Sequence, residues 1–289
     1  MPSSRGGPVV LAAMRRAKIL EEVRRTGGAK VADLTAMLGV SDMTVRRDLE
    51  LLDRKGLLAK VHGGATAVET AGAIELSFEI TSQREVPEKE AIAARAATLI
   101  RPGMAIAITA GSTTWTLARH LADIPDLTVV TNSLKVAEVL HAQQRPDLTV
   151  VLTGGLRTPS DGLVGPIAVQ AIRSLHVDMV FMGVHGLDER AGLTTPNLME
   201  AETNRALVDS ARQLVVVADH TKWGVVALAH IAPLSAIDTL LTDDRLSEEA
   251  AEVLTEQVAE MILIPAIGEF TPALDGGPTA LPRADAPAY

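Results

Sequence analysis

The sequence predicts a small winged helix-turn-helix domain (the head, residues 1–65) followed by a larger α/β domain with a mainly parallel sheet (the body, residues 87–270). In the head, three short amphipathic segments are separated by glycines and followed by a short basic hairpin. In the body, aliphatic runs of about five residues alternate with amphipathic segments, as strands and helices do around a parallel sheet. Aromatic residues make up only 2% of the chain, so the core must be aliphatic, which suits helix-covered parallel strands.

Composition excludes several classes of protein. The chain has no cysteine, which excludes disulfides, thiolate zinc sites and cysteine nucleophiles. No apolar run approaches the roughly 18 residues of a membrane span, and residues 1–8 do not have the pattern of a secretory signal. We therefore expect a soluble, cytoplasmic protein that needs no membrane and no cofactor.

Charge is divided unevenly along the chain. Residues 1–65 hold 12 Lys and Arg against 7 Asp and Glu, a balance of +5, whereas residues 66–289 hold 15 against 29, a balance of −14. A basic head on an acidic body suits local contact with phosphate groups, because the body discourages binding elsewhere. Chance is the alternative, since short windows fluctuate by a few charges.

The head is predicted to place one helix on its surface for recognition. Gly39 follows two amphipathic segments and can supply the positive φ of a sharp helix–helix turn. Ser41 is a good N-cap for the third helix, in which Val45, Leu49 and Leu52 share one inward stripe.

The outer face of this third helix carries two adjacent arginines, Arg46 and Arg47, beside Thr44. An arginine can bond guanine O6 and N7 or clamp a phosphate, and a short wing after residue 57 can lie along the DNA backbone. The alternative is a small helical bundle with a solvated arginine pair. The predicted DNA-contacting residues are Ser41, Thr44, Arg46, Arg47, Lys60, His62, Gly63 and Gly64.

Residues 66–86 show no clear period and are predicted to be a linker, and residues 271–289, rich in Pro, Ala, Gly and Asp, are predicted to be a disordered tail. Between them, small and polar residues follow several predicted strands. In open parallel sheets, ligands bind at the carboxyl ends of strands. Gly111 lets backbone approach closely, and Ser112 to Thr114 offer donors at a helix start, where the dipole favours an anion. An ordinary N-cap cluster is the alternative to a phosphate site here.

Two groups of motifs carry a resemblance to a known family. In the head these are Val40-Ser41, Thr44-Val45-Arg46-Arg47-Asp48-Leu49 and His62-Gly63-Gly64-Ala65. In the body they are residues 111–114, 131–133, 154–155, 181–186 and 192–194, with Glu200-Ala201, Arg205 and Asp219-x-x-Lys222. This pattern closely resembles the DeoR family of bacterial transcriptional regulators, from about residue 14 to residue 245.

The resemblance implies a body similar to ribose-5-phosphate isomerase that senses a phosphorylated sugar or related metabolite. The effector-binding residues predicted from the loops and from this resemblance are Gly111, Ser112, Thr113, Thr114, Asn132, Ser133, Gly154, Gly155, Arg157, His185, Glu200 and Lys222. Two positions depart from the family pattern. Thr109 and His185 stand where relatives usually carry an aspartate, so the sugar cannot be inferred from relatives.

These observations lead to three functional hypotheses. The first is a repressor of a carbohydrate-metabolism operon that binds an operator in double-stranded DNA as a homo-oligomer and responds to a small phosphorylated effector. The second is a phosphosugar isomerase with a DNA-binding head, in which Glu200 is the base and Lys222 its electrostatic partner. The third is a metal site formed by His185, His220 and Asp219, although no close-spaced ligand pair supports it.

Overall fold

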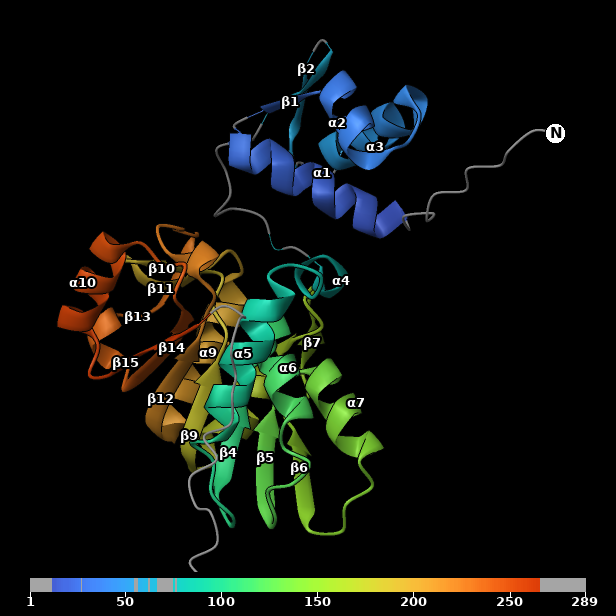
Figure 1. Cartoon of the computed structure of the whole chain (residues 1–289). Helices are drawn as coiled ribbons and strands as arrows, with labels where there is room; N and C mark the ends of the chain where they lie inside the picture. The colour runs from blue at the N-terminus through green and yellow to red at the C-terminus, as the bar shows by residue number, and fades with distance from the viewer. Residues whose placement is uncertain are drawn as a thin grey trace, which may run out of the picture.

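The computed structural model describes residues 12–26, 28–54, 57–61, 63–66, 75 and 77–265. In the described part of the head, three helices pack on a small antiparallel sheet with strand order β1-β3-β2 (Figure 1). The elements are α1 (Ala12–Thr26), β1 (Gly28–Lys30), α2 (Val31–Leu38), α3 (Asp42–Arg54), β2 (Ala59–Val61) and β3 (Gly64–Thr66). The winged helix-turn-helix prediction is confirmed.

Local signals in the head act as the sequence predicts. Gly39 adopts φ +63° at the end of α2, and its N–H donates to the Thr35 carbonyl at 3.0 Å. The Ser41 Oγ accepts from the Thr44 N–H at 3.3 Å, which caps α3. Strand β1 is not predicted by the sequence, because three residues are too few to show a period.

The body is an α/β layer structure, and its mainly parallel sheet confirms the predicted fold class. Among the described residues, seven parallel strands form the order β15-β14-β12-β9-β4-β5-β6. These strands are β4 (Ala105–Ile108), β5 (Leu127–Thr131), β6 (Leu148–Leu152), β9 (Val177–Met182), β12 (Ala211–Val217), β14 (Thr239–Asp243) and β15 (Met261–Ile264).

Helices cover both faces of this sheet. One face packs on α5 (Val86–Ala97), α6 (Ser112–Arg119) and α7 (Leu134–Ala142), which lie in front of the sheet in Figure 1. The other face packs on α8 (Pro166–Arg173), α9 (Leu198–Ser210) and α10 (Glu248–Gln257). The strands alternate between the two cores, since Ile106 and Ile108 belong to the first and Ala107 to the second.

Shorter elements complete the body. A second antiparallel sheet joins β10 (Gly186–Asp188), β11 (Gly192–Thr195) and β13 (Ala229–Ala232), and a hairpin joins β7 (Leu156–Arg157) to β8 (Leu163–Val164). Two 3-10 turns, η1 (His220–Lys222) and η2 (Leu234–Ala236), lie between strands. None of the helices in the described ranges has the length and apolar character needed to cross a membrane.

The strand order reverses direction between β4 and β9. From β4 the chain moves outward through β5 to β6, and from β9 it moves the other way through β12 and β14 to β15. Connections that leave a sheet on opposite sides of such a point open a crevice at the carboxyl ends of the two strands. This crevice is therefore where the fold favours a ligand.

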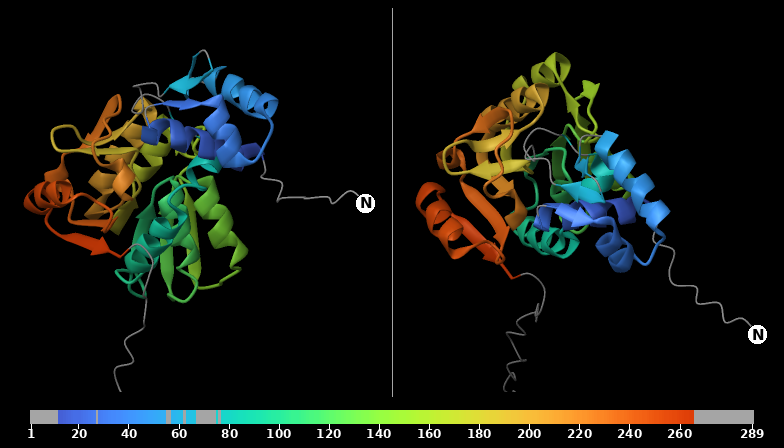
Figure 2. Two further views of the ribbon diagram at one scale, coloured as in Figure 1. Left: turned by 45° about the horizontal axis from the view of Figure 1, so that its top comes forward. Right: turned by 90° about the horizontal axis from the view of Figure 1, so that it is seen from above.

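The stretch predicted as a linker contains ordered structure. Helix α4 (Phe78–Thr81) lies within it, and α5 begins at Val86 rather than Pro87. The Phe78 ring meets the Trp115 ring edge-on, with ring centroids 5.5 Å apart. The sequence shows no period here because α4 has only four residues. The head lies across the end of the body that carries α4, and α1 packs beside α4 (Figures 1 and 2).

Gly64 has a structural reason to be glycine, besides its predicted contact with DNA. A Cβ at this position would lie 2.3 Å from the Ala29 carbonyl oxygen of the neighbouring strand. We expect Gly64→Ala to lower the free energy of unfolding of the head by about 1–3 kcal/mol, because backbone must move. Hydrogen exchange of head amides in urea would measure the loss. Gly63→Ala meets nothing within 4 Å but stands at φ +81°, so it should cost about 1 kcal/mol through backbone strain alone. Equal stability of Gly64→Ala and wild type would contradict the explanation.

Candidate functional sites

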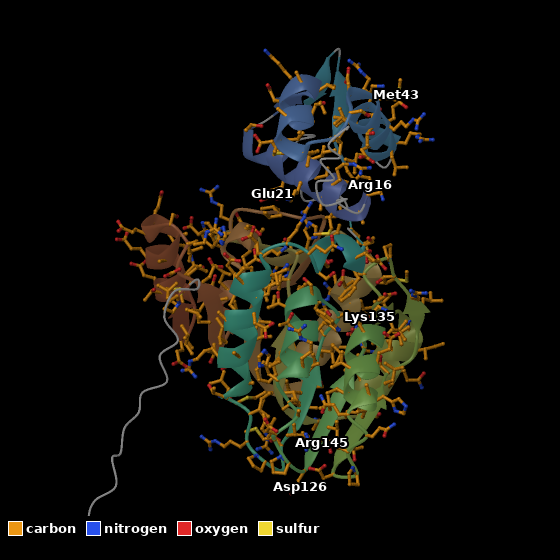
Figure 3. All side chains as sticks on the ribbon, turned by 45° about the vertical axis from the view of Figure 1, so that its right-hand side comes forward. Arg16, Glu21, Met43, Asp126, Lys135 and Arg145 are labelled. Carbon is orange, nitrogen blue, oxygen red and sulfur yellow. The ribbon has the colours of Figure 1, made fainter. Side chains whose placement is uncertain are left out.

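Helix α3 presents a polar surface on the side of the head away from the body. Val45, Leu49 and Leu52 are buried, as the sequence predicts, and Arg46 and Arg47 are exposed. Figure 3 shows Met43, in the first turn of α3, on this outer side. The Arg46 guanidinium bonds the Asp42 carboxylate at 3.1 Å, one turn earlier. The helix therefore offers two guanidinium groups and the Thr44 hydroxyl to a ligand outside the head.

Helix α1 holds α3 from behind through an ion pair to a buried carboxylate. The Arg15 Nε donates to Asp48 Oδ2 at 2.5 Å, and Arg16 reaches the other carboxylate oxygen at 3.5 Å. Asp48 is only 5% exposed although it lies between the two exposed arginines and the helix end. A buried carboxylate needs such partners, because an uncompensated buried charge is costly. The ion pair therefore ties the position of α3 to that of α1.

The wing is also tied to α3. Lys60 donates through Nζ to Glu50 Oε1 at 2.7 Å and through its backbone N–H to Asp53 Oδ1 at 2.9 Å. The hydrogen bond and the charge of Lys60 lower the pKa of Glu50. Gly63 is exposed at φ +81°, in a turn that a glycine adopts without strain. His62 lies outside the described residues, and DNA contact by all eight predicted residues stays a prediction.

One cavity of about 810 Å³ lies at the carboxyl ends of β4, β9 and β12. It brings together six of the predicted effector-binding residues, namely Gly111, Ser112, Thr113, His185, Glu200 and Lys222. Its opposite wall is unexpected, since it includes Lys18 and Glu21 of α1 and a segment around Arg84 before α5. Glu21 lies on the side of α1 that faces the body (Figure 3).

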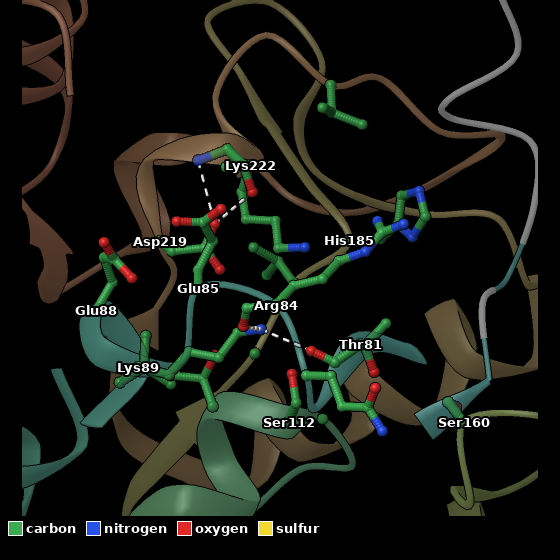
Figure 4. Close-up of a pocket in the computed structure, with 18 of the residues that line it drawn as sticks. Thr81, Arg84, Glu85, Glu88, Lys89, Ser112, Ser160, His185, Asp219 and Lys222 are labelled. Carbon is green, nitrogen blue, oxygen red and sulfur yellow. Dashed lines mark hydrogen bonds between the residues drawn. The ribbon is translucent and has the colours of Figure 1, made fainter. Parts of the chain in front are cut away.

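One end of the cavity favours an anion. Ser112 and Thr113 begin α6, where backbone N–H groups lack helical acceptors and the helix dipole is positive. In Figure 4 the side chains of Lys222 and Arg84 extend into the space above Ser112, with His185 beside Arg84. Hydroxyl groups, amide groups and cations thus border one space, together with the carboxylates of Glu85 and Asp219. The donors and cations among these groups suit a phosphate group.

Two buried charged residues, Lys89 and Asp219, lie near the cationic side chains of Arg84 and Lys222. Lys89 is 3% exposed and donates to the carbonyl oxygens of Thr81 at 2.8 Å and Arg84 at 2.5 Å. Burial lowers the pKa of Lys89 to about 8, although the charge of Asp219 opposes this. Burial alone would raise the pKa of Asp219, but the charges of Lys222 and Lys89, together with the hydrogen bonds from Thr221, outweigh burial and lower the pKa. Lys89 therefore fastens the turn that carries Arg84 into the cavity.

The other end is rich in acceptors. The Glu200 carboxylate accepts from the Thr195 hydroxyl at 2.5 Å. Burial raises the pKa of Glu200 to about 7, and the charge of Glu75 adds to this effect. Asn204 lines the same end, is 3% exposed, and its Oδ1 has no hydrogen-bond partner among the described residues. Such groups suit a ligand that carries hydroxyl groups.

Six predicted effector residues do not line the cavity: Thr114, Asn132, Ser133, Gly154, Gly155 and Arg157. Asn132 instead links loops, since its Oδ1 accepts from the Ala110 N–H at 2.9 Å and its Nδ2 donates to the Leu163 carbonyl at 3.2 Å. Ser133 caps α7 by accepting from the Val136 N–H.

The remaining four have structural explanations as well. Thr114 is fully buried and donates to the Gly111 carbonyl at 3.0 Å. A Cβ at Gly155 would lie 2.5 Å from the Val164 carbonyl oxygen, and Gly154 adopts φ +72°, a conformation that favours glycine. Arg157 pairs with Asp161 at 2.5 Å. Effector binding by these six residues stays a prediction, and the structure gives each another role.

The two departures from the family pattern have different surroundings. Thr109 is 1% exposed, and its hydroxyl accepts from the Gly183 N–H at 3.1 Å, which joins the ends of β4 and β9. His185 lines the cavity. His220, grouped with His185 in the metal hypothesis, bonds the buried Asp243 through Nδ1 at 2.8 Å.

The sequence reading missed Arg84, Lys89 and Lys18 as residues of the cavity. Arg84 and Lys89 lie in and just after a stretch with no period, so pattern alone does not distinguish them from solvated charges. Lys18 belongs to the head, and only the packing of the head on the body brings it to the cavity.

Comparison with protein families decides the identity of both units. The family described as the DeoR-like helix-turn-helix domain matches residues 15–71, and that described as the DeoR C terminal sensor domain matches residues 84–244. The chain belongs to the DeoR family. The family predicted from the motifs is thereby confirmed, and the head and body of this DeoR-family protein are a DNA-binding domain and a sensor domain.

Curated relatives of this DeoR-family chain cover nearly its whole length. HTH-type transcriptional regulator GolR of Listeria innocua is 36% identical over 235 residues, 81% of this chain and 91% of that protein. HTH-type transcriptional regulator GlpR of Haloferax volcanii is 36% identical over 244 residues, 84% and 94% of the two chains. The glycerol-3-phosphate regulon repressor of Escherichia coli is 29% identical over 246 residues, 85% and 96% of the two chains.

Solved structures similar to the chain include ribose 5-phosphate isomerase A of Methanocaldococcus jannaschii. The alignment covers 47% of this chain and 53% of that chain, with 18% identity and a TM-score of 0.34. A similarity at this level carries no argument about function.

Arg47 provides a direct test of the DNA-binding surface of this DeoR-family protein. We expect Arg47→Ala to weaken binding to DNA selected from a random-sequence pool by about 1–3 kcal/mol, because a guanidinium contact to base or phosphate is lost. Fluorescence anisotropy would measure the dissociation constant. Arg212→Ala removes the same charge from an exposed position in the body and should bind as wild type. Unchanged binding by an Arg46→Ala, Arg47→Ala double variant would contradict the role of α3.

The raised pKa of Glu200 makes stability depend on pH. The folded state holds this proton up to about pH 7, whereas the ordinary pKa of a glutamate side chain is 4.5. Its stabilising contribution is therefore complete below pH 4.5 and is lost as the pH rises through 7. Between pH 5 and pH 8, wild type should lose this contribution whereas Glu200→Gln should not. The free energy of unfolding of Glu200→Gln, measured by urea unfolding, should therefore rise by roughly 1–3 kcal/mol relative to that of wild type over this range. Glu202→Gln, on the exposed side of α9, should show no such gain.

Proposed function

We propose that this DeoR-family protein represses a carbohydrate-metabolism operon. A phosphorylated sugar or related metabolite binds in the cavity and changes the affinity of the protein for operator DNA. The observation that carries the proposal is that the two units share the cavity. Sensor residues such as Ser112 and Lys222 form one wall, and Lys18 and Glu21 of the head form the other. A ligand of sufficient size in this space touches both units.

Helix α1 provides a physical route from the cavity to DNA. One side of α1 lines the cavity, while Ile19 and Leu20 are fully buried in the head core and Arg15 bonds Asp48 of α3. A displacement of α1 therefore displaces the recognition helix. A ligand can drive this only if it binds the DNA-competent and DNA-incompetent arrangements unequally, and a coupling of roughly 1–3 kcal/mol is enough.

The chemistry of the cavity supports a phosphorylated ligand. The start of α6 and the cations Lys222 and Arg84 suit a phosphate group, and the Glu200 end suits hydroxyl groups. A relative is named for the glycerol-3-phosphate regulon, which supports the same ligand class. We propose that the cavity recognises this ligand without converting it, in keeping with the sensor-domain description of the family.

A homo-oligomer is part of the proposal. Each chain carries one recognition helix in the described head. Helix-turn-helix proteins commonly read operators with two-fold symmetry as dimers, which doubles the number of base contacts.

Thermal-shift measurements with phosphorylated and free sugars of three to seven carbons would test the function. At about 100 times its dissociation constant, a bound phosphosugar should add roughly 2.7 kcal/mol to stability, and the same compound should change DNA affinity. In the Lys222→Gln variant, the phosphosugar should neither stabilise the protein nor change its DNA affinity. The Arg173→Gln variant, changed on the exposed side of α8, should respond as wild type does. Stabilisation without any change in DNA affinity would contradict a sensor role.

A further inference from the structure

Glu75 belongs to the chain segment that joins the head to the sensor domain, between β3 and α4. Its carboxylate is docked on the sensor domain by two hydrogen bonds. Oε1 accepts from the Ser160 N–H at 3.2 Å, and Oε2 accepts from Asn197 Nδ2 at 2.8 Å. Glu75 also lines the large cavity, and Ser160 lies at the edge of that cavity in Figure 4. One carboxylate thus contacts the sensor wall and faces the ligand space.

Asn197 connects Glu75 to the acceptor end of the cavity. Its Oδ1 accepts from the N–H groups of Met199 and Glu200 at 3.0 and 3.2 Å, so it caps α9. These bonds also orient the amide, because only Nδ2 remains to face Glu75. Glu75, Asn197 and the first turn of α9 therefore form one hydrogen-bonded unit that ends at the Glu200 backbone N–H.

The Glu75 carboxylate has capacity for further donors. Each of its oxygens accepts one hydrogen bond in the structure, whereas a carboxylate offers about four lone-pair sites. On α9, one turn after Glu200, the buried Asn204 Oδ1 has no partner within the described ranges, and leaving a buried acceptor unsatisfied is unfavourable. Ligand hydroxyl groups would satisfy both residues.

The segment after Glu75 is held at further points around the cavity. The Phe78 N–H donates to the Pro159 carbonyl at 3.4 Å, next to Ser160, and the Phe78 ring packs on Trp115 of α6. Lys89 then holds the Thr81 and Arg84 carbonyls. A ligand that bonds Glu75 therefore acts directly on the segment that carries the head.

We propose that Glu75 is a ligand-binding residue as well as an anchor of the connecting segment. In this inference, which rests on the proposed function, hydroxyl groups of a phosphorylated sugar bond the Glu75 carboxylate while the phosphate group occupies the start of α6. Ligand binding and the position of the connecting segment are coupled through this one carboxylate. The ligand class is a phosphosugar with hydroxyl groups at the end opposite the phosphate.

Glu75→Gln tests the inference, because both carboxylate oxygens face donors and an amide NH2 can replace neither without losing a hydrogen bond. Phosphorylated sugars of three to seven carbons and inorganic phosphate serve as probes, with dissociation constants measured by calorimetry. We expect Glu75→Gln to weaken the tightest phosphosugar at least about tenfold, as for a hydrogen bond to a charged group. It should also reduce the effect of that phosphosugar on DNA affinity.

The matched control is Glu79→Gln, an equal change at an exposed position on α4, which should behave as wild type. Binding of DNA alone by Glu75→Gln should stay within about threefold of wild type, which would separate a ligand contact from loss of fold. Wild-type phosphosugar affinity and DNA response in Glu75→Gln would overturn this inference and leave the proposed function intact. If no phosphosugar bound the wild-type protein more tightly than inorganic phosphate, the proposed function and this inference would both fail.

Discussion

The reversal of strand order between β4 and β9 is the constraint on which the sensor domain depends. Because the connections diverge there, the loops after these two strands stay apart at their tips while the strands remain hydrogen-bonded. The Thr109 hydroxyl and the Gly183 N–H hold the two strand ends together at 3.1 Å. A glycine at each loop, Gly111 and Gly183, keeps side chains out of the space between them. The cavity is a consequence of this topology.

Charged groups gathered at the cavity are stable only because they compensate each other. Lys89 and Asp219 are almost fully buried, and each offsets part of the desolvation cost of the other. Burial, only partly opposed by the hydrogen bond from Thr195, raises the pKa of Glu200 to about 7. The cavity therefore has one end with cations and one end with hydrogen-bond acceptors, which matches a ligand with a phosphate group and hydroxyl groups.

Two of the segments that border this cavity, α1 and the connecting segment, belong to the head or join it to the sensor domain. Helix α1 lines it with Lys18 and holds α3 through the Arg15–Asp48 ion pair. The connecting segment lines it with Glu75, and the turn that follows α4 lines it with Arg84 and is fastened by Lys89. Rigid elements and buried ion pairs of this kind can transmit a small displacement, because packed cores deform little.

The sequence alone determined the elements whose signals are local. Ser41 caps α3 and the stripe of Val45, Leu49 and Leu52 turns inward, so Arg46 and Arg47 face outward. Alternating aliphatic and amphipathic runs likewise sufficed for the α/β class, because burial on both faces requires continuous apolar strands.

Tertiary structure alone decided which loops meet. Gly111, Glu200 and Lys222 converge on one cavity, whereas Asn132 and Gly155, equally close to strand ends in sequence, are used to join loops and pack strands. Lys18 and Glu75 reach the cavity only through the docking of the head and its connecting segment. The physical reason is that strand order and domain packing arise from contacts between residues far apart in the chain, which leave no periodic pattern in the sequence.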